Sequence, residues 1–173
     1  MSDYYGRVSA DQDALTKLIS YIPGFSGYIE REKRRAADKL LRDTVARRFE
    51  ELYKRLSALQ SELIQQGAIE FVDDMEKAAV LMRTFTDKIR NATYGYAGFF
   101  DAVKINEQEL AQLYAFDNAF FELGEQINAA LDTVEQSLGT PEALPAAIRH
   151  LTSLNREAVN TFDRRYEVVS GSK

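Results

Sequence analysis

Several residue types are rare or missing in this chain of 173 residues, and each absence excludes a class of site. Cysteine is absent, which excludes disulfides, thiolate metal sites, iron–sulfur clusters and thiol nucleophiles. There is one histidine, His150, so a catalytic or metal site built on several imidazoles is excluded as well. The 3 prolines and 9 glycines are too few to be typical of a loop-rich all-β domain.

Long hydrophobic runs are also absent. No segment approaches the roughly 18 consecutive apolar residues of a membrane span. Residues 1–7 show no basic region followed by an apolar one, so we expect no secretory signal there. Because a chain without cysteine is compatible with a reducing compartment, we expect a cytoplasmic protein.

The composition that remains is that of a globular protein, with 45% hydrophobic and 28% charged residues. A chain of this length can bury a sizeable core. We therefore expect a single helical-bundle domain over residues 1–173, with a helix and turn over 1–27 and a frayed tail over 170–173.

Charge is distributed unevenly along the chain, whose net charge is −5. Residues 31–55 hold ten basic and five acidic side chains, whereas residues 101–139 hold eight acidic side chains and one basic. If the two segments pack side by side, their opposite charges favour that pairing; if they do not, the molecule has a basic end or face. An acidic protein is a poor general binder of nucleic acid, although a local basic patch can still bind.

Apolar residues recur with the period of α-helices, and turn signals separate the periodic segments. Within the second segment the apolar spacings alternate between 4 and 3 from Val45 to Leu63, as in a coiled-coil seam. Asn106, followed by Glu109, resembles a capping box, and we expect Thr140 to cap the last helix with Pro141 at its first position. The expected helices cover residues 10–22, 28–66, 70–91, 106–138 and 141–169.

Long amphipathic helices with short connections predict an all-α fold. More specifically, they predict an antiparallel up-and-down four-helix bundle of long helices with an extra short N-terminal helix. The helix over 28–66 is longer than the one over 70–91. It therefore either extends beyond the bundle or is covered by residues 91–105 and the first helix.

Asp117 is the most unusual polar residue, because it falls on an apolar stripe, as does Gly124. A buried carboxylate must be paired, hydrogen-bonded or protonated. One interpretation is a structural salt bridge, for example to an arginine of the helix over 28–66, and another is an acid in a binding pocket. A third is a local rotation that turns Phe116 inward and Asp117 outward.

Residues 94–100 combine aromatic side chains with two glycines. They can pack the end of the bundle, with the glycines allowing tight turns. They can also form a docking surface, because tyrosine and phenylalanine supply large contact areas. The candidates for partner binding are Tyr94, Tyr96, Phe99 and Phe100.

A basic run opens the helix expected over 28–66. It is either a solvated helix face or a contact for anionic lipid, nucleic acid or an acidic protein. The candidates for an anionic surface are Arg31, Lys33, Arg34, Arg35 and Lys39.

Sequence patterns of metal and nucleotide sites are missing. A di-iron carboxylate bundle needs Glu-x-x-His, but the residue three positions before His150 is Ala147. Zinc spacings, the phosphate-loop pattern and the dinucleotide pattern are also absent. We therefore predict no catalytic residue, no metal site and no cofactor.

The segment from Ile22 to Asp38 contains Ile-Pro-Gly-Phe-Ser-Gly-Tyr followed by mixed charges. It resembles the opening of a family of uncharacterised prokaryotic helical proteins. The resemblance covers under a tenth of the chain and implies no activity and no functional residue.

The leading hypothesis is a non-enzymatic helical-bundle module that acts through contact with another protein. Its partner is not identified by the sequence, and a homo-oligomer is an alternative. A second hypothesis is peripheral binding to acidic lipid or nucleic acid through the basic run, and these partners are less favoured. A third is a small-molecule or metal site inside the bundle near Asp117.

Overall fold

The computed structural model describes residues 2–92 and 97–171. Every regular element in these ranges is helical, and six α-helices pack against one another, which confirms the all-α prediction. Two short 3-10 turns, Arg31–Lys33 and Ile69–Phe71, precede the second and third helices. The helices are α1 (Ser2–Tyr21), α2 (Arg34–Gln65), α3 (Val72–Asn91), α4 (Ala97–Phe100), α5 (Glu107–Gln136) and α6 (Leu144–Ser170).

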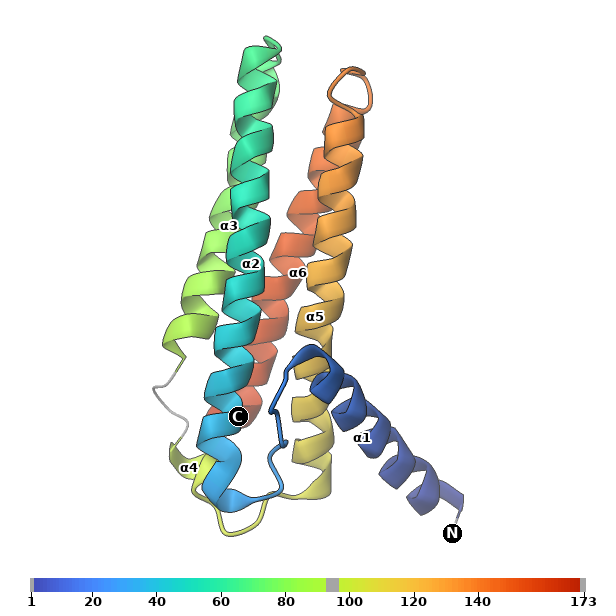
Figure 1. The fold of residues 1–173 in the computed structure, drawn as a ribbon, viewed down its shortest axis with the longest axis vertical. Coiled ribbons are helices and arrows are strands. Elements are labelled where there is room, and N and C mark those ends of the chain that lie inside the picture. The colour runs from blue at the N-terminus through green and yellow to red at the C-terminus, as the bar shows by residue number, and fades with distance from the viewer. Residues whose placement is uncertain (1, 93–96, 172–173) are drawn as a thin grey trace.

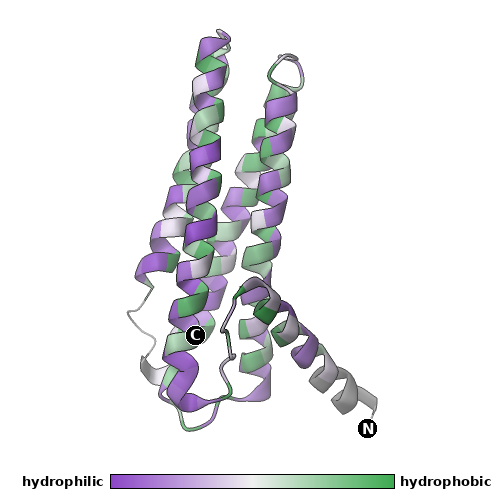
Figure 2. Cartoon of the chain, viewed as in Figure 1, coloured by the Kyte–Doolittle hydropathy of each residue, from purple (hydrophilic) through white to green (hydrophobic). Residues whose placement is uncertain are grey.

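Helices α2, α3, α5 and α6 lie lengthwise beside one another (Figure 1). Helix α2 packs against α3 and α5, and α6 packs against the same two helices. Polar and apolar residues alternate along these helices (Figure 2), so each helix can turn an apolar face inward. The buried side chains at the centre include Phe49, Leu56, Met82, Phe85, Phe120, Ile127 and Leu151.

Helix α1 lies against α5 and projects sideways from the other helices (Figure 1). Its attachment lies near its carboxyl end, where the Tyr21 ring stacks on Phe121 with the ring centres 4.6 Å apart. Lys17 pairs with Glu122 at 2.5 Å. The helix begins at Ser2 and not at residue 10, and its 20 residues equal the length of α3, so the prediction of a short N-terminal helix is wrong.

Helix α2 begins at Arg34, six residues later than predicted. The predicted start fails because Tyr28 enters the core, and residues 28–30 bend before the 3-10 turn. The Arg34 side chain then donates hydrogen bonds to the carbonyl groups of Tyr28 and Ile29. The end of α2 at Gln65 agrees with the predicted stop before Gly67.

The predicted start of the last helix is wrong. Residues 137–143 form turns, in which the Ala143 amide donates to the Thr140 carbonyl, and α6 begins at Leu144. The reason is Pro145. In a helix starting at Pro141, Pro145 would lie beyond the first turn, where its ring clashes with the preceding turn and its missing N–H removes a hydrogen bond. In the observed helix it occupies the first turn, where proline is tolerated.

Other local predictions are confirmed. The Asn106 side chain accepts a hydrogen bond from the Glu109 amide at 2.8 Å and caps α5. Helix α3 starts and ends within two residues of its predicted bounds. The connection over 91–105 contains the short helix α4, while residues 93–96 lie outside the described part of the chain.

Helix α2, which holds most of the basic segment, contacts α5, which holds most of the acidic segment. Arg55 forms ion pairs with Asp132 and with Glu135, the latter at 2.8 Å. Gly124 permits close packing of the two helices, because a Cβ atom at this position would lie 3.0 Å from the Nε atom of Arg48. None of the described helices combines the length and the apolar character needed to cross a membrane.

Candidate functional site

Asp117 is completely buried in the core, on the inward face of α5. Its Oδ2 atom accepts a hydrogen bond from the Tyr28 hydroxyl at 2.6 Å, and its Oδ1 atom accepts one from the Arg165 Nε atom at 2.7 Å. The interpretation in which Asp117 points outward is therefore wrong, because the apolar stripe continues through this position. The salt bridge exists, but its arginine comes from α6 and not from α2.

The pair belongs to a larger group of buried side chains. The Arg165 Nη2 atom also donates to Asp38 Oδ1 at 2.8 Å, and Asp38 Oδ2 accepts from Arg42 Nε at 2.8 Å. Arg42 then donates to the carbonyl groups of Ile89 and Arg90 near the end of α3. We call this group the ionic network; its members are Tyr28, Asp38, Arg42, Asp117 and Arg165.

The ionic network joins α2, α3, α5 and α6, since its charged side chains come from α2, α5 and α6 and its last contacts reach α3. It contains two carboxylates and two guanidinium groups, so opposite charges alternate inside the core. A buried carboxylate or guanidinium group is costly unless it is paired with an opposite charge and hydrogen-bonded. Because every charged member is nearly inaccessible to water, the arrangement fixes the helices relative to one another.

Tyr28 reaches the ionic network through a turn that depends on glycine. Gly27 has φ of +76°, and a Cβ atom there would lie 2.5 Å from the Tyr114 hydroxyl oxygen. A side chain at this position would therefore be strained and would also collide with Tyr114. The Tyr114 hydroxyl accepts a hydrogen bond from the Tyr28 amide at 3.1 Å, which fixes the turn against α5.

Burial shifts the pKa of two members of the ionic network. Desolvation raises the pKa of Asp117 to about 6, although the Arg165 charge and the hydrogen bonds from Tyr28 and Arg165 oppose the shift. The pKa of Tyr28 lies well above its usual value of 10, because of burial and the nearby Asp117 charge. Tyr28 therefore remains a hydroxyl donor at neutral pH.

The structure separates the members of the basic run. Arg34 is only 4% exposed and donates to the carbonyl groups of Tyr28 and Ala102, so it is not part of an anionic-binding surface. It is buried because it satisfies backbone acceptors where two loops meet. The other members of the run are exposed: Arg31, Lys33, Arg35 and Lys39.

The aromatic candidates for partner binding also differ in their exposure to solvent. Phe100 is only 1% exposed and lies beside the rings of Tyr28 and Phe99, so it packs the end of the core and cannot dock a partner in this conformation. Phe99 is half-buried. Tyr94 and Tyr96 lie outside the described residues.

Within the described residues there is no group of three or more histidine, cysteine, aspartate or glutamate side chains that could hold a metal ion. Near Asp117, both carboxylate oxygens accept hydrogen bonds from the chain itself. The geometry therefore favours the structural interpretation of Asp117. His150 is exposed on α6.

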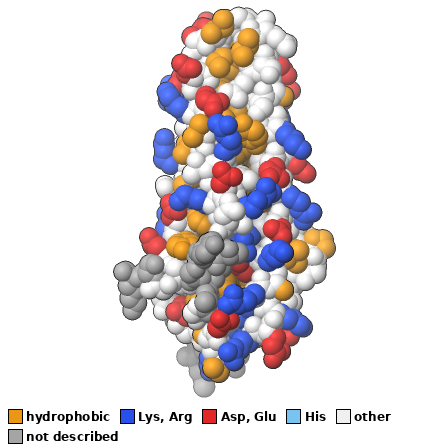
Figure 3. All heavy atoms as spheres, turned by 90° about the vertical axis from the view of Figure 1, so that its left-hand side faces the viewer, with side chains coloured by type: hydrophobic (Ala, Val, Ile, Leu, Met, Phe, Trp, Pro, Cys, Tyr) orange, Lys and Arg blue, Asp and Glu red, His pale blue; other side chains and the backbone are white. Residues whose placement is uncertain are grey.

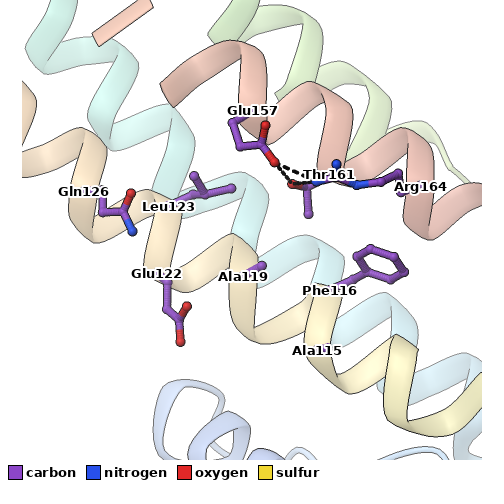
Figure 4. Close-up of a pocket in the computed structure, with 9 residues that line it drawn as sticks. All are labelled: Ala115, Phe116, Ala119, Glu122, Leu123, Gln126, Glu157, Thr161 and Arg164. Atoms are coloured by element: carbon purple, nitrogen blue, oxygen red, sulfur yellow. Dashed lines mark hydrogen bonds and ion pairs between the residues drawn. The ribbon is translucent and has the colours of Figure 1, made fainter. Parts of the chain in front are cut away.

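An open groove of about 470 Å³ runs between α5 and α6 (Figure 4). Side chains of α6 border one side, where the Arg164 Nη2 atom donates to Glu157 Oε1 at 2.6 Å. From α5, Glu122 extends away from α6 and pairs with Lys17 of α1. The lining residues are Ala115, Phe116, Ala119, Glu122, Leu123, Gln126, Glu157, Thr161 and Arg164.

Neither this groove nor most of the ionic network is predicted by the sequence patterns described above. Arg165 could have been noticed, because it lies on the buried stripe between Phe162 and Val169. The pair Asp38/Arg42 has helical i,i+4 spacing, which is also typical of exposed pairs. No sequence pattern indicated that Tyr28 is buried, because this residue was expected to begin the helix over 28–66.

No protein-family model matches this chain, and no curated protein or solved structure matches it. The class of protein is therefore defined by the fold and the site alone: an all-helical protein whose core contains a buried network of paired charges.

Proposed function

We propose that this chain is a non-enzymatic interaction module that binds an amphipathic helix of another protein in the groove between α5 and α6. We take its scaffold to be an antiparallel up-and-down four-helix bundle with α1 attached to one side. The observation that carries the proposal is the floor of the groove, where apolar and small side chains of α5 follow helical spacing.

The floor is formed by four side chains of α5 with successive spacings of one, three and four positions, which place them on one face of the helix. They are Ala115, Phe116, Ala119 and Leu123. Alanine side chains allow the backbone of a bound helix to approach closely, and Phe116 and Leu123 supply apolar contact. An amphipathic helix commonly binds by laying its apolar face into a groove of this kind. Polar side chains on the α6 border can then set its direction.

A role without catalysis is supported by the way the buried charges are used. The two carboxylates of the ionic network are both engaged by arginine side chains, with Tyr28 as a further donor. They do not converge on a position for a substrate.

The proposal can be tested with a photo-crosslinking amino acid placed in the groove. Ala115 and Ala129 are both exposed alanines of α5, but only Ala115 lines the groove. We expect p-benzoylphenylalanine at position 115, irradiated in cells that express the chain, to give an adduct of discrete mass. The same probe at position 129 is the matched control and should give none.

Mass spectrometry of the adduct then identifies the bound segment. An adduct within a helical segment of another protein supports the proposal. Absence of an adduct at position 115, or the same adduct at both positions, contradicts it. An adduct of twice the mass of the chain shows that a second copy occupies the groove, which also overturns the proposal of a different protein.

A further inference from the structure

One end of the molecule carries two strongly exposed apolar side chains. Ile29 is 65% exposed, and Val103 is 83% exposed. They belong to loops that meet at the same end of the molecule, at the base of α2 and before α5 (Figure 1). We call this end, residues 29–35 and 101–104, the basic tip.

Arg34 fixes the two loops of the basic tip to each other. Its Nη2 atom donates to the Ile29 carbonyl at 3.3 Å, and its Nη1 atom donates to the Ala102 carbonyl at 2.8 Å. A second link joins Arg35 to Asp101 at 2.7 Å. Because Arg34 is buried, the positions of Ile29 and Val103 are set by the fold.

Cations are close in sequence to both apolar side chains. The basic tip contains five basic and three acidic residues, in a chain whose net charge is −5. Within the described residues no ion pair holds Arg31 or Lys104, while Lys33 and Arg35 form exposed pairs that water screens. Lys and Arg side chains gather over the lower part of the face seen in Figure 3, with acidic side chains among them.

The opposite end of the molecule offers a natural comparison. Ile64 and Ile69, at the turn between α2 and α3, are 55% and 67% exposed. Residues 62–73 around them contain three acidic residues and no lysine or arginine. The two ends are therefore similar in exposed apolar area and differ in charge.

From this combination we propose that the basic tip binds the surface of an anionic lipid membrane, with Ile29 and Val103 inserted among the lipids and the neighbouring cations against the headgroups. This site is separate from the groove and does not depend on it. Apolar side chains that enter the interface and cations that meet acidic lipids each add to membrane affinity. Projecting aliphatic side chains favour a lipid surface over nucleic acid, which binds through phosphate contacts and base stacking.

Sedimentation with lipid vesicles tests the proposal. We expect the full chain to bind vesicles of equal parts phosphatidylcholine and phosphatidylserine, and not vesicles of phosphatidylcholine alone. Raising the salt to about 1 M, where the Debye length is roughly 3 Å, should weaken binding strongly. The double variant Ile29→Ser/Val103→Ser should bind about tenfold less tightly or worse.

Matched variants distinguish binding through the basic tip from nonspecific hydrophobic adsorption to vesicles. The variant Ile64→Ser/Ile69→Ser removes similar side chains from the other end and should bind like the unchanged chain. Arg31→Gln and Lys104→Gln should each reduce binding about fivefold. Equal losses at the two ends, or equal binding to neutral vesicles, would overturn the proposal.

A fluorescence experiment reports insertion directly, because the chain has no tryptophan. A tryptophan introduced by Val103→Trp should shift its emission to shorter wavelength when phosphatidylserine vesicles are added. The corresponding Ile69→Trp variant should show no shift. No shift at position 103, or binding to RNA with no binding to vesicles, would contradict membrane insertion.

Discussion

Arg165 connects the two buried carboxylates of the ionic network, with Nε on Asp117 and Nη2 on Asp38. Asp38 has a second cation in Arg42, whereas Arg165 is the guanidinium group that pairs with Asp117. The two carboxylates therefore differ in how strongly they depend on Arg165. Loss of this one side chain should affect the core more than loss of any exposed charge.

We expect Arg165→Met to lower the free energy of unfolding by about 3–5 kcal/mol, because it leaves a buried carboxylate without its cation. Urea denaturation measures the change. The neighbouring Arg164 is exposed, so Arg164→Met is a matched control and should cost less than about 1 kcal/mol. Similar losses for the two variants would show that the buried pairs contribute no more than a surface pair.

Asp117 gives a prediction about pH. Burial raises its pKa in the folded chain to about 6, above the ordinary value of 3.8, so the folded state binds this proton more tightly than the unfolded state. Its contribution to stability is therefore complete below about pH 4 and is lost as the pH rises through 6.

The variant Asp117→Asn mimics the protonated acid and should be insensitive to this titration. We expect the two proteins to have similar free energies of unfolding near pH 4. Toward pH 7 the unchanged protein should lose about 2–3 kcal/mol relative to the variant. Denaturation curves over this range measure the difference. A relative change in the opposite direction would mean that the pairing with Arg165 outweighs desolvation.

At the scale of elements, a capping residue in the sequence marks the start of α5 but not the start of α6. Asn106 caps α5 through a hydrogen bond from the Glu109 amide, whereas Thr140 lies in a turn three residues before the cap of α6. The two residues resemble each other as capping candidates in the sequence. Pro145 distinguishes them, because it is tolerated only near the start of a helix.

We expect Asn106→Ala to lower the free energy of unfolding by about 1 kcal/mol, since a helix-terminal amide loses its acceptor. Thr140→Ala serves as the comparison and should change stability by no more than about 0.5 kcal/mol. Thermal denaturation followed by circular dichroism would reveal both effects. A larger cost at position 140 would contradict the observed start of α6.

For the molecule as a whole, charge and small residues help to select which helices become neighbours. Arg55 of α2 forms ion pairs with Asp132 and Glu135 of α5. Gly124 brings the same two helices close together. The contact between α2 and α5 thus includes both ion pairs and a position without a side chain.

A charge exchange tests the contribution of the ion pairs. Arg55→Glu places like charges together, and we expect it to cost about 1 kcal/mol at low salt. Adding Asp132→Lys should restore part of the loss, because it renews an opposite pair, and high salt should reduce both effects. If the double variant were no more stable than the single variant, the interaction between these positions would be negligible.

The sequence by itself determined the helical class, the bounds of α3 and α5 to within two residues, the end of α2 and the cap at Asn106. These properties depend on local spacing and composition, which can be read along one chain. Tertiary structure alone decided the partner of Asp117, the burial of Arg34 and Phe100, and the groove between α5 and α6. Each of these depends on side chains far apart in sequence, and their contacts exist only after the helices have packed.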